Sequence, residues 1–253
     1  MLIDTHCHLD APEFAADRDA CHAAALAAGV TAMVIPAVTV NGFLATKTTA
    51  ARYPGCHAAY GIHPLYVMQA AEQDLLTLRQ WLASEKPVAV GEIGLDGYVP
   101  ELDPARQELF YVAQLKLARE FALPVLLHVR RAVDQVLKHL RRVRVVGGIA
   151  HAFNGSRQQA DEFIKLGFKL GFGGAMTYSG STRIRALARE LPLESIVLET
   201  DAPDIPPAWL AGQRHPPASL MRIAQTLAEL RAEPLERILA QTTQNARQVL
   251  PGI

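Results

Sequence analysis

Hydrophobic and polar positions follow two alternating patterns along the chain. Short apolar runs typical of strands recur throughout, separated by longer segments with apolar residues at i, i+3 and i+4, such as "DPARQELFYVAQLKLAREFAL" and "SRQQADEFIKLGF". The eight apolar runs cover residues 2–6, 31–37, 57–63, 87–93, 124–129, 145–151, 168–174 and 195–200. Two further helical stretches, at 216–231 and 234–249, follow the eighth run.

This order predicts eight consecutive strand and helix units. We therefore expect one α/β domain over residues 1–253, a (β/α)₈ TIM barrel with additional C-terminal helices. A doubly wound sheet is the structural alternative. It usually has fewer strands and a glycine-rich phosphate loop after the first strand, and "THCHLDAPEF" is unlike such a loop.

Composition narrows the class of protein further. Half of the 253 residues are hydrophobic, and 25 Lys+Arg balance 25 Asp+Glu, so a nucleic-acid substrate would have to be bound locally rather than along a basic surface. The three cysteines, Cys7, Cys21 and Cys56, have no CxxC spacing, and no apolar run is long enough to span a membrane. We expect a cytoplasmic protein with reduced thiols and no membrane partner.

Ionisable residues gather at the ends of the apolar runs, where a barrel builds its chemistry. Those residues are His6, His8, His63, Glu92, His128, His151 and Asp201. Taken singly, each could be a hydrogen-bonded structural histidine or a helix-capping carboxylate. Brought together at one mouth, they would be hard to satisfy without an ion, which predicts a metal site.

The chemistry of these donors indicates the ion and the reaction. The ends of the first, fourth, fifth, sixth and eighth runs supply four imidazoles, those of His6, His8, His128 and His151, and two carboxylates, a set that suits Zn²⁺ or Mn²⁺ better than Ca²⁺. Six ligands exceed one tetrahedral site, and a carboxylate can bridge two ions about 3.5–4 Å apart. The prediction is metal-assisted hydrolysis, in which a carboxylate accepts a proton from the attacking water.

Six short motifs carry a family resemblance. In order and spacing, "DTHCHLD", "GIHP", "GEIGLD", "PVLLHVR", "HAFNGS" and "LETDAP" resemble the TatD family of metal-dependent hydrolases, from residue 2 to "NARQVL" near the end. Through "ETDAPDIP" and "LHVRR" the chain is most similar to the YjjV-type branch. The resemblance implies a TIM barrel and a deoxyribonuclease or related phosphodiesterase that acts on 3′ ends of single-stranded DNA. It also implies two divalent ions, whether Mg²⁺, Mn²⁺ or Zn²⁺, and we expect a monomer.

The resemblance also assigns roles to the six ligands. One ion would be held by His6, His8 and Asp201 and a second by His128 and His151, with Glu92 bridging the two. Asp201 would in addition accept the proton of the nucleophilic water, so that Asp201 and Glu92 are the expected catalytic residues.

Four other residues are candidates for supporting roles. His63 in "GIHP" would touch substrate phosphate rather than metal, and Arg130 could bind phosphate bidentately or be a solvated surface arginine. Asp4 is expected to orient a ligand or to be structural. Asp96 is expected to orient a ligand or to cap a helix.

Three positions depart from the family pattern. Leu65 replaces a second histidine, Gly97 stands where an aromatic residue is common, and His215 occupies an asparagine position. Tyr98 could stack on a base in place of the aromatic residue. All six ligand positions are kept, so these departures bear on the choice of substrate.

Two other kinds of function stay open. One is hydrolysis of a different substrate, either another ester, such as an aminoacyl ester on transfer RNA, or an amidohydrolase-like substrate. Against the latter, related barrels often carry a modified lysine where this chain has Glu92. The other is a non-catalytic binding protein on the same fold. Degenerate relatives usually lose ligands first, and none is lost here.

Overall fold

The eight strands form one parallel sheet in which each strand pairs with the next along the chain. The computed structural model describes residues 1–253. The strands are β1 (Leu2–Asp4), β2 (Val30–Pro36), β3 (Cys56–Tyr60), β4 (Ala89–Asp96), β5 (Val125–Arg130), β6 (Gly148–Ala150), β7 (Phe168–Phe172) and β8 (Ile196–Leu198). The chain then returns beside β1, where Thr5 N donates to Leu198 O at 3.1 Å and Asp201 N donates to His6 O at 2.8 Å. This contact completes the ring and confirms the predicted barrel.

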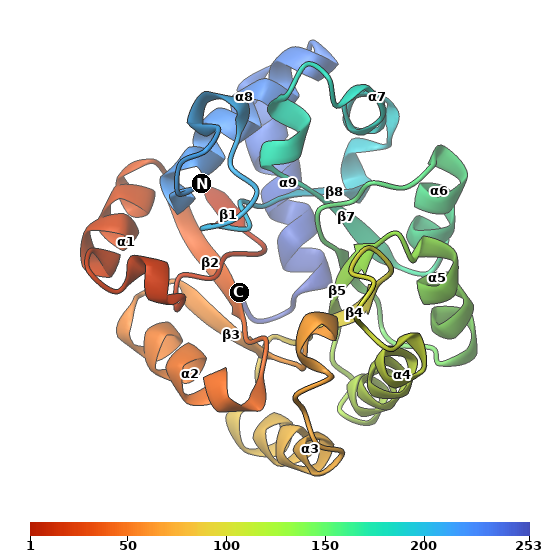
Figure 1. Cartoon of the computed structure of the whole chain (residues 1–253). Helices are drawn as coiled ribbons and strands as arrows, with labels where there is room; N and C mark the ends of the chain where they lie inside the picture. The colour runs from red at the N-terminus through yellow and green to blue at the C-terminus, as the bar shows by residue number, and fades with distance from the viewer.

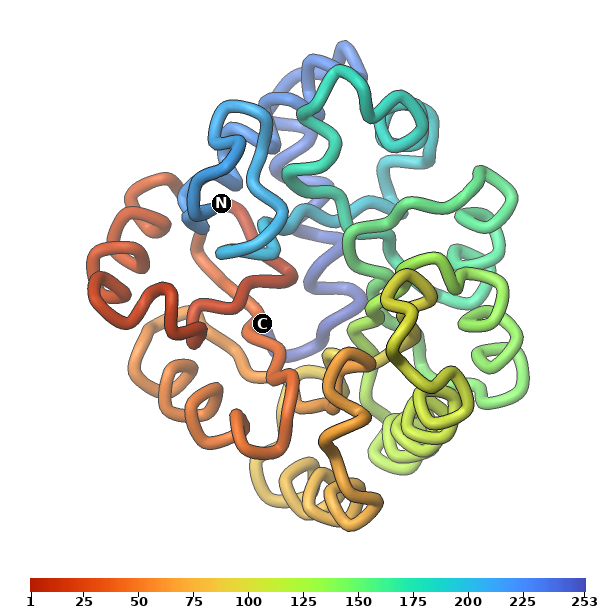
Figure 2. The backbone as a smooth tube through the Cα atoms, viewed as in Figure 1, coloured from red at the N-terminus to blue at the C-terminus, as the bar shows by residue number.

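The helices surround the ring of strands, except the last, which crosses behind it (Figure 1). They are α1 (Arg18–Ala27), α2 (Phe43–Arg52), α3 (Gln73–Glu85), α4 (Pro104–Glu120), α5 (Val133–Arg142), α6 (Arg157–Lys165), α7 (Thr182–Glu190), α8 (Leu220–Arg231) and α9 (Leu235–Val249). Ser156 caps α6 in a reciprocal capping box with Gln159. Figure 2 shows the loops after β3, β4 and β8 gathered around the front opening of the ring.

Some boundaries differ from the sequence pattern. The first run was expected to be strand over 2–6, but β1 ends at Asp4, so His6 and His8 follow the strand. The third strand ends before His63, which begins the short 3₁₀ helix η3 (Pro64–Tyr66). Near the C-terminus, α8 starts later than 216 because residues 217–219 form a separate 3₁₀ turn.

Alternation along the strands divides the core into two layers. On β8, Ile196 and Leu198 pack between strands and helices, whereas Val197 faces the inside of the barrel. The inner layer consists of Ile3, Ala32, Val34, Ala59, Ala89, Leu126, Ile149 and Val197, packed against Ala246, Val249 and Leu250 from the C-terminal end of α9. Thus α9 lies across the far end of the ring and seals the floor of the barrel (Figure 1).

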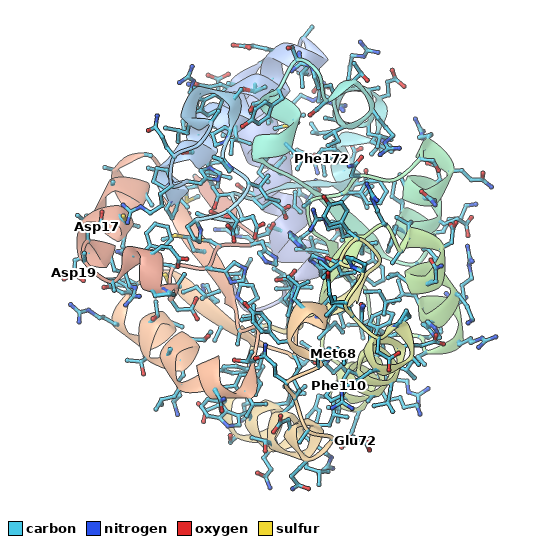
Figure 3. The ribbon with its side chains drawn as sticks, viewed as in Figure 1. Asp17, Asp19, Met68, Glu72, Phe110 and Phe172 are labelled. Carbon is cyan, nitrogen blue, oxygen red and sulfur yellow. The ribbon has the colours of Figure 1, made fainter.

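Charged side chains project from the outer surface of the barrel. In Figure 3, Asp17 and Asp19 project from the outside of the molecule beside α1, whereas Phe172 lies within it and is only 1% exposed. No helix of this barrel has both the length and the apolar character needed to cross a membrane.

Candidate metal centre

The period of the strands carries two histidines to the mouth of the barrel. Leu126 and Ile149 both point into the interior, and the residues two positions later, His128 and His151, therefore face the same side one step nearer the opening. Each of these two strands thus places an apolar side chain in the interior and a histidine at the mouth.

Glu92 lies at the centre of the cluster and divides the imidazoles into two pairs. Its Oε1 is 3.0 Å from His151 Nε2 and 3.2 Å from His128 Nδ1. Its Oε2 is 3.2 Å from His6 Nε2 and 3.7 Å from His8 Nε2. The carboxylate is buried, and its two oxygens face different pairs among these four histidines.

Asp201 completes the side that faces Oε2. Its Oδ1 lies 3.6 Å from Nε2 of both His6 and His8. The donor atoms of His6, His8 and Asp201 lie within 4.8 Å of one another, as do those of His6, Glu92 and His151. The structure therefore brings together all six residues that the sequence singled out as ligands.

The electrostatics of the cluster favour a bound cation. Burial, with His151 as the next cause, lowers the pKa of His6 to about 3, so this imidazole is neutral and keeps a lone pair. Burial opposes ionisation of Glu92, but the neighbouring histidines outweigh it and hold the pKa of Glu92 well below its usual value. Burial also disfavours charged His151, yet Glu92 and Glu199 outweigh it and raise the pKa of His151 well above the ordinary value. A site that retains a proton so strongly has the donor set and charge to hold divalent ions instead.

Asp96 contacts the opposite side of the His128 ring. Its Oδ2 is 2.9 Å from His128 Nε2, while its Oδ1 accepts from Tyr98 N at 2.8 Å and from Val99 N at 3.2 Å. One oxygen of Asp96 thus contacts the histidine and the other closes the turn after β4, whereas the expected alternative of a helix cap does not occur, because Asp103 is the N-cap of α4. His128 is left with Nδ1 aimed at Glu92.

Glu199 is a site residue that our sequence analysis missed. It is 1% exposed, its Oε1 accepts from Ala152 N at 2.5 Å, and this oxygen lies 3.7 Å from His151 Nδ1. Neither His151 Nδ1 nor Glu199 Oε2 has a hydrogen-bond partner. The signal was available, because Glu199 stands midway between interior Val197 and Asp201 in the same alternation.

His63 lies beside the ligands as a hydrogen-bond donor. Its Nδ1 accepts from Leu65 N at 3.1 Å, so the proton of the neutral ring is on Nε2, which is 3.3 Å from Glu92 Oε1. The donor atoms of His63, Glu92 and His128 also lie within 4.8 Å of one another. A protonated Nε2 nevertheless has no lone pair for an ion, which sets His63 apart from the six ligands.

A cavity of about 1120 Å³ opens above the cluster, and both His63 and Arg130 line it. The Arg130 side chain is half exposed, with Nη1 4.0 Å from Asp96 Oδ2. Asp4 lies outside this cavity. It accepts hydrogen bonds from Thr200 N and Thr200 Oγ1 at 3.0 and 2.6 Å and from the backbone N of His6, and it makes no hydrogen bond to an imidazole.

The three departures from the family pattern have distinct positions. Leu65 lines the cavity. Gly97 packs against the next strand so closely that a Cβ there would lie 2.8 Å from Arg131 O. His215 is fully buried below the mouth, where its Nδ1–H donates to Asp204 O at 3.0 Å.

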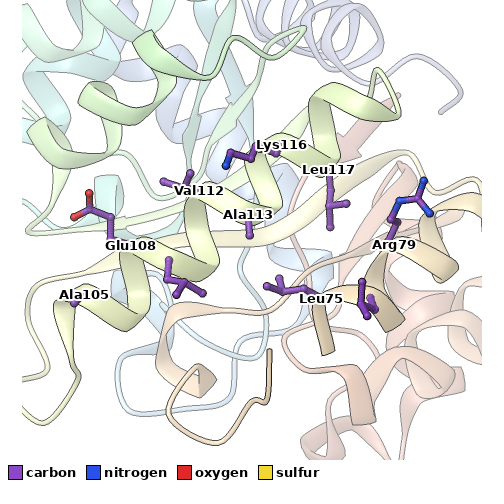
Figure 4. Close-up of a pocket in the computed structure, with 10 residues that line it drawn as sticks. Leu75, Arg79, Ala105, Glu108, Val112, Ala113, Lys116 and Leu117 are labelled. Carbon is purple, nitrogen blue, oxygen red and sulfur yellow. The ribbon is translucent and has the colours of Figure 1, made fainter. Parts of the chain in front are cut away.

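A second hollow lies on the outside of the barrel. It is a groove of about 630 Å³ between α3 and α4, lined mainly by apolar side chains that include Leu75, Val112 and Leu117 (Figure 4). It is lined by no histidine or cysteine and has one carboxylate, Glu108, so it lacks the donors of a metal centre.

Comparisons with known proteins show the family of this chain. The family model described as TatD related DNase matches residues 3–251. The chain is 41% identical over 240 residues to the uncharacterized metal-dependent hydrolase YjjV of Escherichia coli K12, covering 94% of this chain and 93% of that protein. The crystal structure of that TatD homolog superposes with a TM-score of 0.94 at 39% identity, covering 98% of this chain and 97% of the other.

A more distant relative has a more specific name. A Pantoea protein named 3′-5′ ssDNA/RNA exonuclease TatD is 33% identical over 256 residues, 98% of each chain. The family model matches nearly the whole chain, and these relatives are more than 30% identical over nearly their full length. The chain belongs to the TatD family of metal-dependent hydrolases.

Proposed function

We propose that this protein is a metal-dependent exonuclease that hydrolyses phosphodiester bonds at the 3′ ends of single-stranded nucleic acid, with DNA as its substrate. The observation that carries the proposal is the division of donors around Glu92, whose two oxygens face separate imidazole pairs. Two adjacent cation sites sharing a carboxylate suit the displacement at a phosphodiester. The name of the Pantoea relative supports the same substrate class.

The ligand sets follow from these contacts. His6, His8 and Asp201 would hold one divalent ion and His128 and His151 the other, with Glu92 between them. When bound, the ions would polarise phosphoryl oxygens and make water more acidic. A mixed imidazole and carboxylate set suits Zn²⁺ and Mn²⁺ better than Mg²⁺, which prefers oxygen ligands.

The chain's own groups supply proton acceptance and substrate orientation. Burial raises the pKa of Asp201 to about 6, close to neutrality, which suits a carboxylate that takes a proton from the attacking water. His63 lines the cavity, and its Nε2–H, which lies 3.3 Å from Glu92 Oε1, is the group that would donate to a phosphoryl oxygen. Arg130 reaches the same cavity and can bind phosphate through its fork of N–H groups.

The lining of the cavity favours an anionic substrate over a neutral ester or amide. Arg130, Arg131 and Arg183 line it, and of its four carboxylates two, Glu92 and Asp201, belong to the ligand set, which leaves Asp134 and Asp204. Outside the ligand set, arginines therefore outnumber carboxylates in the lining, and a nucleic-acid end that enters this mouth would meet them.

The test starts from metal-stripped protein and a single-stranded DNA oligonucleotide labelled at its 5′ end. Mg²⁺, Mn²⁺ and Zn²⁺ are added back separately, and Asp201→Asn is assayed beside the wild type. Asp161→Asn is the matched control, because it removes a carboxylate from the exposed face of α6.

We expect a ladder of products shortened from the 3′ end only when metal is present, with at least about a hundredfold loss in Asp201→Asn and none in the control. Tight metal binding without nucleotide release would reject the nuclease assignment and direct attention to other esters.

A further inference from the structure

We propose that Tyr98, Arg130 and Arg131 form a binding platform for a second phosphate of the substrate chain, next to the phosphodiester that is hydrolysed. This inference rests on the proposed function and specifies how that site would prefer a polynucleotide over an isolated phosphodiester. The three residues line the cavity above the metal ligands. The proposal rests on how they are held together, on their charge and on their distance from the ligands.

Two guanidinium groups share one aromatic ring. The Arg130 guanidinium carbon is 3.7 Å from the centroid of the Tyr98 ring, and that of Arg131 is 4.5 Å from it. Stacking on an aromatic ring fixes the plane of a guanidinium while leaving its edge N–H groups free for an anion. The ring therefore orders two positive groups that would otherwise repel each other.

The backbone beneath the platform is held by the pairing of β4 with β5, which extends beyond the core. Pairing of β4 with β5 continues to Asp96 and Arg130, and Gly97 N then donates to Arg130 O at 2.7 Å. A side chain at position 97 would bring its Cβ within 2.8 Å of Arg131 O, so glycine permits this close approach. Asp96 also accepts from Tyr98 N, which anchors the turn that presents the ring.

The platform is positively charged and only weakly neutralised. Arg131 has no ion pair, and the nearest carboxylate oxygen to Arg130 is Asp96 Oδ2 at 4.0 Å, which already contacts His128 at 2.9 Å. Asp134 and Asp204 also line the cavity, and Asp134 accepts a hydrogen bond from Gln159.

The same contacts fix the distance between the platform and the ligands. One carboxylate group separates the guanidinium of Arg130 from the ring of His128. That spacing puts a bound anion beside the proposed reaction centre rather than in it. A polynucleotide offers such an anion in its next phosphate, and a small diester with a single phosphate does not.

The experiment compares two substrates that differ in this respect. The metal-loaded enzyme is assayed on a five-nucleotide single-stranded DNA and on bis(p-nitrophenyl) phosphate, which carries one phosphate. The variants are Arg130→Ala, Arg131→Ala and Tyr98→Ala. Arg144→Ala is the control, because Arg144 is an exposed arginine before β6, at the opposite end of the barrel.

We expect the ratio of kcat/KM for the oligonucleotide to kcat/KM for the small diester to fall at least tenfold in each arginine variant and to stay constant in Arg144→Ala. The salt dependence of log KM for the oligonucleotide should become shallower by about one unit per arginine removed. Equal losses on both substrates, or no loss on either, would overturn the platform.

A binding measurement separates this inference from the nuclease assignment. Fluorescence anisotropy with metal-free protein and the labelled oligonucleotide needs no catalysis. If the wild type cleaves no DNA, the proposed function fails. The platform is then supported by weaker oligonucleotide binding in Arg130→Ala and Arg131→Ala, and rejected by binding equal to that of the wild type.

Discussion

Glu199 lies behind His151, with Oε1 3.7 Å from Nδ1 on the side of the ring that faces away from Glu92. The imidazole is thus held between two buried carboxylates. A carboxylate on the outer nitrogen fixes the orientation and tautomer of a ligating histidine and raises its basicity. This relationship gives Glu199 a task that needs no contact with substrate.

Glu199→Gln should therefore weaken metal binding. The amide is nearly isosteric but is uncharged, so the loss expected is about 10–100-fold in affinity, the usual effect of removing such a partner. Competition with a chromogenic chelator measures the affinity directly. Glu194→Gln is the matched control, because Glu194 is an exposed residue in the short 3₁₀ turn before β8. Unchanged affinity in Glu199→Gln would contradict this role.

Glu92→Gln should change the number of ions as well as their affinity. An amide has one oxygen and a nitrogen that cannot serve as a ligand, so it cannot face both imidazole pairs with oxygen. We expect metal content, measured by mass spectrometry after desalting, to fall from two ions to one or fewer per chain. Glu236→Gln, on the exposed side of α9, should retain the wild-type content. Two ions in Glu92→Gln would show that this carboxylate does not bridge.

Gly171→Ala should destabilise the fold through Glu199. A Cβ at position 171 would lie 2.1 Å from Glu199 Oε2, within the packed interior. Overpacking of this kind costs about 1–3 kcal/mol in the free energy of unfolding, which denaturant titration measures.

A double-mutant cycle identifies the cause of that loss. Glu199→Ala removes the clashing oxygen, so the double variant should be more stable than the sum of the single effects predicts. Gly180→Ala is the control, since a Cβ there meets nothing within 4 Å. Strict additivity of Gly171→Ala and Glu199→Ala would mean that the two residues do not interact.

Asp4 should make the stability of the metal-free protein depend on pH. Burial raises the pKa of Asp4 from 3.8 to about 8, although hydrogen bonds from Thr200 oppose the shift. Because the folded pKa is the higher one, the stabilisation is complete below the unfolded value of 3.8 and is lost as pH rises through about 8. Between pH 5 and 7 the wild type should therefore lose on the order of 1 kcal/mol of unfolding free energy per pH unit relative to Asp4→Asn.

Urea titrations of both proteins at several pH values measure this difference. The comparison isolates Asp4, because the other titrating groups of the site are common to both proteins. Parallel stability curves for the two proteins would show that Asp4 is ionised in the folded state.

Much of the fold and of the ligand set could be predicted because both depend on local pattern. An apolar run predicts each strand, and the barrel brings the ends of all the strands to one mouth. His128 and His151 could therefore be paired with Glu92 although 36 and 59 positions, respectively, separate them from it. The family motifs then divided the ligands between two ions.

The rest depends on register, which the pattern of one chain does not contain. The need for glycine at position 97 is visible only once Arg131 O is seen beside it. The shared ring of Tyr98 likewise depends on how far β4 and β5 pair beyond the core. Glu199 was overlooked for another reason, since a carboxylate inside an apolar run drew less attention than the one that ends it.

The sealed floor of the barrel limits how substrate and product can enter and leave. Ala246, Val249 and Leu250 fill the end opposite the ligands, so the barrel is closed at that end and is not a tunnel. A polymer cannot thread through it, and whatever is released must leave by the way the substrate came in. Under the proposed function, each product must therefore leave through the opening by which the nucleic-acid strand enters, before the strand can advance.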